Sequence, residues 1–271
     1  LAVPGHMYSR ISNPTVEALE NKMAELEGGV GALCTSSGQS ASMVAILNVC
    51  EAGDHFISLN TIYGGTYNLF AITLKKMGVD VTFVDADASQ EEISSYIKEN
   101  TKAIFGETIA NPALKVLDIE KFAKIAHEHR IPLIVDNTFA TPYLCRPFEH
   151  GADIVIHSTT KYLDGHATSV GGVIVDSGNF DWKNGKFPSF TNPDPSYHGL
   201  AYAEAFGNMA YIVKARVQFI RDIGNYLSPM NAFLTNLGIE TLHLRMERHC
   251  SNALQVAQHL EKHAKVSKVQ Y

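Results

Sequence analysis

Short apolar blocks and polar or glycine-rich breaks alternate along the first two thirds of the chain. Apolar residues at helical spacing follow Asn13-Pro14, where the asparagine caps a helix and the proline takes its first position. The pattern predicts helices over residues 14–27, 38–49 and 66–77, one that Ser89 and Glu92 cap, and one from Asp118 to about His129. Shorter apolar runs predict strands over residues 31–35, 55–59, 79–84, 102–107, 133–136, 153–157 and 170–176. This alternation predicts an α/β fold with a mostly parallel sheet sandwiched by helices.

The pattern changes after about Ser177. Residues 187–199 are rich in proline, asparagine and serine and predict an ordered loop. Long helical stretches are predicted over residues 200–226 and 240–263. The final residues, 266–271, predict the beginning of a further strand.

Composition limits what the protein does. Of its 271 residues, 45% are hydrophobic and 18% are charged, which is typical of a globular protein. The net charge of −6 comes from interspersed acidic and basic residues, so neither a nucleic-acid-binding face nor a polybasic membrane patch is indicated. The four cysteines lie far apart and predict reduced thiols in a cytoplasmic protein. No apolar run is long enough for a membrane helix, and residues 1–5 lack the features of a signal peptide.

Reactive residues gather where the predicted strands end, which is where open α/β sheets bind ligands. Ser37-Gly38-Gln39 lies between a strand and a helix, so its backbone N–H groups form a candidate phosphate site or, alternatively, an ordinary capped turn. Asp136 follows three large apolar residues and needs a cationic partner if it is buried. That partner is a protonated pyridine nitrogen or, equally, an arginine, a lysine or a backbone cap.

Two further sites carry candidate chemistry. Ser158 and Thr160 occupy alternate positions at a strand end, so both hydroxyls can reach one oxyanion. Lys161 follows them and could condense with an aldehyde, although a lone lysine at a strand end is more commonly a surface residue. Tyr63 precedes Gly64-Gly65 and could stack on a flat ring, although core packing is the commoner role of a tyrosine.

Together these sites match the three demands of pyridoxal phosphate (PLP). The cofactor needs its phosphate anchored, its ring nitrogen kept protonated and its aldehyde held by an amine. A phosphate cradle, a buried acid and a lysine beside hydroxyls supply these functions, and the combination weakens the alternative reading of each site. No metal site is expected, because His127-Glu128-His129 lacks the spacing of a zinc motif.

At this point the sequence resembles the Cys/Met-metabolism family of PLP enzymes, which includes cystathionine synthases and lyases, methionine γ-lyase and O-acetylhomoserine sulfhydrylase. The resemblance covers essentially the whole chain. It rests on Tyr8-Ser9-Arg10 with Asn13-Pro14-Thr15, Ser37-Gly38-Gln39, Tyr63-Gly64-Gly65-Thr66, Asn111-Pro112, Val135-Asp136-Asn137-Thr138-Phe139, Ser158-Thr159-Thr160-Lys161-Tyr162, Gly165-His166 and Gly171-Gly172. Within the family, residues 136–147, 187–199 and 227–233 are most similar to the O-acetylhomoserine sulfhydrylases.

The resemblance implies fold type I, the aspartate aminotransferase-like fold, and a role for each candidate residue. Lys161 holds the cofactor as a Schiff base and Asp136 pairs with the ring nitrogen. The cofactor's phosphate is bound by Ser37, Gly38, Gln39, Ser158 and Thr160, while Tyr63 stacks on the ring and assists proton transfer, and Asn111 lies near the ring hydroxyl. Tyr8 and Arg10 reach the phosphate of a neighbouring subunit. The protein is then a homodimer that shares its active sites, or a tetramer of such dimers. Either Tyr63 or the Tyr8 of the neighbouring subunit assists departure of the leaving group.

The resemblance also implies a division of the chain. Residues 1–30 form an N-terminal arm and first helix, residues 31–225 the PLP-binding large domain, and residues 226–271 a long helix and the start of a small C-terminal domain. Family members extend past the position of Tyr271 and supply an arginine for the substrate carboxylate there, so the chain is expected to be processed or incomplete, or else the protein departs from its family.

The expected reaction is a γ-replacement in methionine biosynthesis. Sulfide or a thiol displaces acetate from O-acetyl-L-homoserine to give L-homocysteine, with Lys161 as the general base at the substrate Cα. Other enzymes of the family remain open, namely cystathionine γ-synthase and the γ-eliminating lyases of methionine and cystathionine. A PLP-fold protein without turnover is the non-enzymatic alternative.

Overall fold

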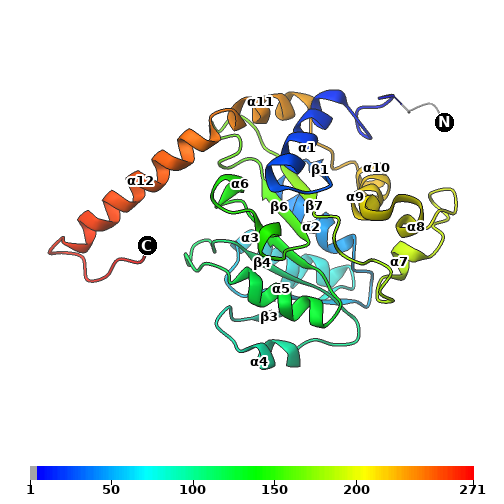
Figure 1. The fold of residues 1–271 in the computed structure, drawn as a ribbon, viewed down its shortest axis with the longest axis horizontal. Coiled ribbons are helices and arrows are strands. Elements are labelled where there is room, and N and C mark those ends of the chain that lie inside the picture. Colours follow the sequence, from blue (N-terminus) through cyan, green and yellow to red (C-terminus); the bar gives the residue numbers. More distant parts are fainter. Residues whose placement is uncertain (1–4) are drawn as a thin grey trace.

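A computed structural model describes residues 5–271. The prediction that residues 1–5 are not a signal peptide therefore falls mostly outside the described residues. A single sheet forms the centre of the molecule (Figure 1). Its strands are β1 (Gly31–Thr35), β2 (His55–Leu59), β3 (Asp80–Val84), β4 (Thr101–Glu107), β5 (Leu133–Asp136), β6 (Ile154–Ser158) and β7 (Gly172–Asp176). They lie in the order β1-β7-β6-β5-β4-β2-β3, and β7 runs antiparallel to both of its neighbours while the other pairs are parallel. The predicted strands and the mostly parallel sheet are confirmed, with strand ends shifted by one or two residues.

Helices pack on this sheet, and the central strands are buried. The helices of the first two thirds are α1 (Pro14–Glu27), α2 (Gly38–Leu47), α3 (Gly64–Asn68), α4 (Gln90–Ser95), α5 (Ile119–Glu128) and α6 (Thr141–Leu144). Helix α1 contacts β1 and β7, α2 contacts β6 and β7, and α5 contacts β4 and β5. Strands β5 and β6 are mostly apolar and almost wholly buried, as a sheet covered by helices requires.

Side-chain caps define several predicted helix ends. Asn13 accepts a hydrogen bond from the N–H of Thr15 at 2.9 Å, and α1 ends at Gly28 in the left-handed conformation. Ser89 caps α4 and Asp118 caps α5, each accepting from the backbone three residues on. Local sequence therefore sets where these helices begin.

The last third differs more from prediction. The stretch expected as one helix over 200–226 is broken into α8 (Tyr202–Phe206), α9 (Ala210–Ala215) and α10 (Arg221–Ile223), joined by 3-10 and π-helical turns. The predicted 187–199 loop contains α7 (Pro188–Thr191), and α11 (Pro229–Ile239) was not predicted. Residues 266–271 form no strand, so that prediction was wrong, because no described strand lies beside them to supply backbone hydrogen bonds.

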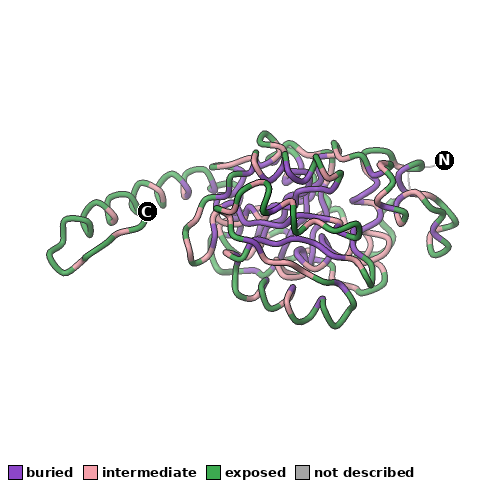
Figure 2. The backbone as a smooth tube through the Cα atoms, turned by 90° about the horizontal axis from the view of Figure 1, so that it is seen from below, coloured by how far each residue is buried: buried purple, intermediate pink, exposed green. Residues whose placement is uncertain are grey.

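Helix α12 (Leu242–Glu261) projects away from the body of the molecule (Figure 1). Along its length only Leu242 and Met246 are buried, and most of the helix and the segment after it are exposed (Figure 2). No helix within residues 5–271 is long and apolar enough to cross a membrane. All four cysteines are free, and Cys34 and Cys50 are buried, as expected for reduced thiols.

Asp176, the last residue of β7, is fully buried at the edge of the sheet where the parallel strands begin. Its Oδ1 accepts the N–H of Gly178 at 2.9 Å, and its Oδ2 has no partner among the described residues. Burial, reinforced by the nearby charge of Asp153, raises the pKa of Asp176 to about 7. The folded protein therefore keeps a proton here that the unfolded chain has released, so stability falls as the pH rises from 3.8 to about 7.

Asp176→Asn should remove that loss. The difference in unfolding free energy between the variant and the parent should grow by up to about 3 kcal/mol as the pH rises from about 5 to about 8. Urea unfolding of both proteins at the two pH values measures the gain. An equal difference at both values would show that Asp176 does not carry a proton in the folded state.

Candidate active site

A cavity of about 570 Å³ opens at the edge of the sheet where the parallel strands end. It is lined by all the predicted site residues except Tyr8 and Arg10, namely Ser37, Gly38, Gln39, Tyr63, Asn111, Asp136, Ser158, Thr160 and Lys161. Further lining residues are Thr66, Glu107, Ile109, Thr138, Phe139, Tyr162, Gly165, Ala167 and His249. Residues from widely separated parts of the chain therefore meet in one place, as the strand-end rule predicts.

The start of α2 forms one wall of the cavity. Ser37 caps this helix by accepting the N–H of Ser40 at 3.1 Å. Gly38 and Gln39 lie in the first turn, so their N–H groups have no helical acceptor. A Cβ atom on Gly38 would lie 2.5 Å from the Cβ of Ser158, so only glycine lets the helix approach β6 this closely. Backbone N–H groups, the positive end of a ten-residue helix and the Ser158 hydroxyl thus adjoin one another, an arrangement that fits a phosphate.

Gly38→Ala should therefore weaken cofactor binding more than it weakens the fold. We expect a roughly 10-fold or greater rise in the dissociation constant for PLP and a stability loss of about 1–3 kcal/mol from the close contact. Absorbance titration and thermal unfolding measure the two effects. Gly64→Ala is the matched control, because Gly64 also begins a helix but a Cβ there meets nothing within 4 Å. Equal PLP affinity in both variants would contradict the assignment.

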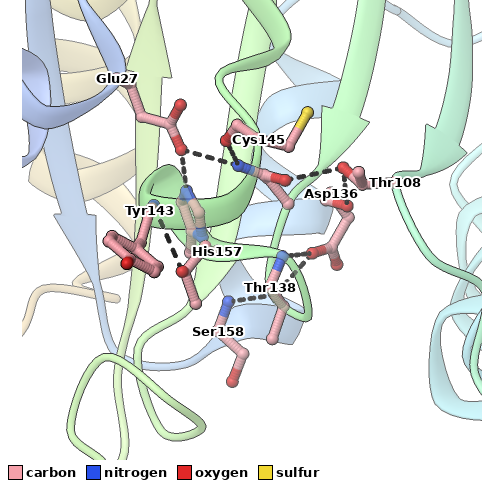
Figure 3. Close-up of polar contacts among 10 residues, drawn as sticks. Glu27, Thr108, Asp136, Thr138, Tyr143, Cys145, His157 and Ser158 are labelled. Carbon is pink, nitrogen blue, oxygen red and sulfur yellow. Dashed lines mark hydrogen bonds and ion pairs between the residues drawn. The ribbon is translucent and has the colours of Figure 1, made fainter. Parts of the chain in front are cut away.

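Asp136 ends β5 with its carboxyl group on the cavity. Thr138 donates both its N–H, at 2.9 Å, and its hydroxyl, at 2.5 Å, to the Oδ1 atom, while the same hydroxyl accepts the N–H of Ser158 at 2.8 Å (Figure 3). Oδ2 has no hydrogen-bond or ion-pair partner within residues 5–271. Desolvation raises the pKa of Asp136, and the two Thr138 hydrogen bonds oppose that rise. A desolvated carboxyl group with one oxygen unused fits a cation such as a pyridinium.

Behind Asp136 lies a buried polar cluster that ties α1 to the sheet. Glu27, the last residue of α1, is 2.6 Å from Nε2 of His157, and its Oε1 also accepts the amide of Asn137 at 3.0 Å (Figure 3). The Asn137 side chain in turn accepts the hydroxyl of Thr108 at 2.8 Å. Because these groups hold Asn137, which follows Asp136, and His157, which precedes Ser158, they help to fix the ends of β5 and β6.

Lys161 lies in the turn that follows β6. Its side chain is exposed toward the cavity and makes no ion pair in the described part of the chain. Nearby, Thr160 is held in place by Gly171, whose N–H and carbonyl both lie 3.2 Å from its hydroxyl oxygen. Lys161 thus supplies the amine that covalent attachment of an aldehyde cofactor requires, and two hydroxyls and a carboxyl group share the cavity with it.

The structure places Tyr8 and Arg10 away from this cavity. The Arg10 guanidinium lies 5.1 Å from the centre of the Tyr8 ring and donates to the carbonyl of Arg221. Within one chain these two residues do not join the other predicted ones. No group of three or more His, Cys, Asp or Glu side chains in residues 5–271 is arranged to hold a metal ion, and His127 instead bonds Asp153 at 2.9 Å.

Glu107 and Thr138 are site residues to which sequence reasoning gave no role. Glu107 ends the apolar strand β4 just as Asp136 ends β5, and the two residues are paired in register. Asp136 was singled out because three large apolar residues precede it, whereas Glu107 follows Ile104-Phe105-Gly106. A search for any acid at the end of a mostly apolar strand would have found both residues. Thr138 carried no such signal, because its hydrogen bond to Ser158 depends on how β5 and β6 pair.

Comparison with known proteins also indicates a PLP-dependent enzyme. The sequence profile described as "Cys/Met metabolism PLP-dependent enzyme" matches residues 2–271. O-acetyl-L-homoserine sulfhydrylase from Leptospira meyeri is 51% identical over 98% of this chain and 62% of its own length. Homocysteine synthase from Schizosaccharomyces pombe is 49% identical over 100% of this chain and 64% of its own length.

A solved structure is also closely similar. A Campylobacter jejuni protein assigned as an O-acetylhomoserine (thiol)-lyase, which carries N'-pyridoxyl-lysine-5'-monophosphate, superimposes with a TM-score of 0.93 at 39% identity, over 97% of this chain and 65% of that one. The chain thus spans slightly less than two thirds of the length of these relatives. With a profile match across nearly all its residues and relatives about half identical to it, the chain belongs to the Cys/Met-metabolism family of PLP-dependent enzymes and has their type I fold.

Proposed function

We propose that the protein binds PLP covalently at Lys161 and replaces the acetoxy group of O-acetyl-L-homoserine with the sulfur of sulfide or a thiol. With sulfide the products are L-homocysteine and acetate, a step of methionine biosynthesis. The observation that carries the proposal is the single cavity shared by Lys161, Asp136 and the start of α2. The names of the relatives, O-acetyl-L-homoserine sulfhydrylase and homocysteine synthase, support the choice of substrate.

Each predicted site residue that lines the cavity has a part in holding the cofactor. The N–H groups of Gly38 and Gln39, with the hydroxyls of Ser37, Ser158 and Thr160, bind its phosphate. Asp136 keeps its ring nitrogen protonated, Tyr63 stacks on the ring, and Asn111 lies at the ring hydroxyl. When bound, PLP condenses with amines through its aldehyde, and its protonated ring accepts the electron pair released when a Cα proton leaves.

Lys161 moves the protons of the reaction. Its Nζ, once free of the cofactor, removes the proton from the substrate Cα and later returns it. A base in the cavity takes a second proton from Cβ, and acetate leaves with the electron pair of the Cγ–O bond. Sulfide then forms the new Cγ–S bond, and the proton returns to Cβ. Tyr63, half-exposed on the cavity wall, assists departure of the acetate, with Tyr8 of a second subunit as the other candidate for that role.

Supplying O-acetyl-L-homoserine with and without sulfide tests the proposal. Replacement requires sulfide and yields homocysteine and acetate in equal amounts. A γ-eliminating lyase would instead release an oxo acid and ammonia without sulfide, and a cystathionine γ-synthase would prefer cysteine as the nucleophile. Bound PLP with no turnover of any of these substrates would point to a protein without catalysis.

We propose further that the protein works in the cytoplasm as a homodimer, or a tetramer of dimers, with shared active sites. The position of Tyr8 and Arg10 outside their own chain's cavity supports this arrangement, because it leaves them available to a neighbouring cavity. In the same scheme residues 31–225 form the PLP-binding domain, residues 1–30 the arm that crosses to the neighbour, and residues 226–271 the start of the small domain. Mixing inactive Lys161→Ala and Arg10→Ala chains tests the sharing, since hybrid dimers should regain one intact site.

A further inference from the structure

Glu107 lies on the cavity beside Asp136 and has no part in the proposed chemistry. It is the last residue of β4, is only 6% exposed and is paired in register with Asp136 of β5. Burial and the neighbouring Asp136 charge raise the pKa of Glu107 to about 8. Burying a carboxyl group costs free energy, so we expect Glu107 to make contacts that an apolar side chain could not make.

The contacts of Glu107 join two separate loops. Its Oε1 accepts the backbone N–H of Tyr63 at 2.7 Å, and its Oε2 accepts the backbone N–H of Asn111 at 3.2 Å. Tyr63 lies in the loop between β2 and α3, and Asn111 in the loop after β4. One carboxyl group therefore fixes the backbone of two residues whose side chains line the same cavity.

We propose that Glu107 is a positioning residue that holds the Tyr63 and Asn111 loops at the separation needed to enclose the cofactor ring. The proposal rests on the proposed function only in naming these two residues as ring contacts. Both acceptor oxygens are needed, because two N–H donors approach the carboxyl group from different loops. An amide offers one oxygen and would set its own N–H groups against one of the donors.

Glu107→Gln tests this clamp in the full chain without added PLP. We expect amide hydrogen exchange to rise roughly 10-fold in the loop that loses its acceptor oxygen, residues 62–66 or residues 109–112, the change expected for loss of one hydrogen bond. The dissociation constant for PLP should rise by a similar factor, measured by absorbance titration. Asp176→Asn is the matched control, since it also removes a buried carboxyl group of raised pKa but at the opposite edge of the sheet.

The outcomes separate cleanly. Faster exchange in one or both of these loops in Glu107→Gln, with neither loop altered in Asp176→Asn, supports the clamp. Unchanged exchange in both loops, or equal changes throughout the sheet, overturns it. If Glu107→Gln does not fold, Glu107→Asp keeps a carboxyl group of shorter reach, and faster exchange in at least one of the two loops is required of it.

The exchange measurement does not depend on turnover. If the parent protein failed to convert O-acetyl-L-homoserine, the proposed function would be wrong. The exchange result would still test whether Glu107 holds the two loops. If Glu107 had only a structural role, its replacement would lower stability and leave both the PLP affinity and the exchange of these two loops unchanged.

Discussion

Lys161→Ala should lower turnover of O-acetyl-L-homoserine at least about 10³-fold, because the variant loses both the covalent anchor of the cofactor and the base at the substrate Cα. The fold should survive, since the Lys161 side chain is exposed and makes no ion pair within residues 5–271. Borohydride treatment of the PLP-loaded parent, followed by peptide mapping, should place the cofactor on Lys161, and the variant should yield no such peptide.

Lys183→Ala provides the comparison for a change of charge alone. Lys183 is paired with Glu204 at 2.8 Å and does not line the cavity, so its loss should leave turnover unchanged. A modified peptide in Lys161→Ala, or activity equal to that of Lys183→Ala, would show that another amine holds the cofactor.

The second large effect is expected from Asp136→Asn. An asparagine keeps the Oδ1 acceptor for both Thr138 hydrogen bonds, so the ends of β5 and β6 should keep their arrangement. It cannot hold the ring nitrogen in its protonated form, so turnover should fall by about 10²–10³-fold, the usual effect of losing one charge aimed at the reacting group.

Stability distinguishes a loss of chemistry from a loss of fold. Because desolvation disfavours the ionised form of Asp136, its replacement by a neutral group should leave the cofactor-free protein at least as stable as the parent at neutral pH. Measurements of kcat together with urea unfolding separate the two effects. Unchanged kcat would remove Asp136 from the electron-withdrawing role, and a large drop in stability would assign it to the fold instead.

Much of the candidate site was predictable because its signals are local. A strand followed by Ser37-Gly38, or by an acid such as Asp136, can be recognised within a few residues of sequence. The sheet then brings these strand ends together without further information, since parallel strands end at the same edge. The resemblance to the family linked each signal to a part of the cofactor.

What could not be predicted depends on contacts across the fold. The pairing of β4 with β5 determines that Glu107 faces the same cavity as Asp136, and Thr138 acquires its role only through Ser158 on the next strand. Helical periodicity over 200–226 did not reveal the interruption at Gly207, whose backbone is non-helical. The 266–271 run has the composition of a strand, but composition supplies no neighbouring strand.

The isolation of α12 has a consequence for how the state of the protein is judged. Beyond His249, which lines the cavity, no side chain of this twenty-residue helix is buried. Its outer part therefore has little beyond its own hydrogen bonds to resist melting, whereas the cavity is built on the buried strands of the sheet. Mild warming should therefore reduce the far-ultraviolet circular dichroism signal while the yellow colour of bound PLP persists. For this chain, retention of the cofactor is the sounder measure of native protein, and helical content alone would report damage that the active site has not suffered.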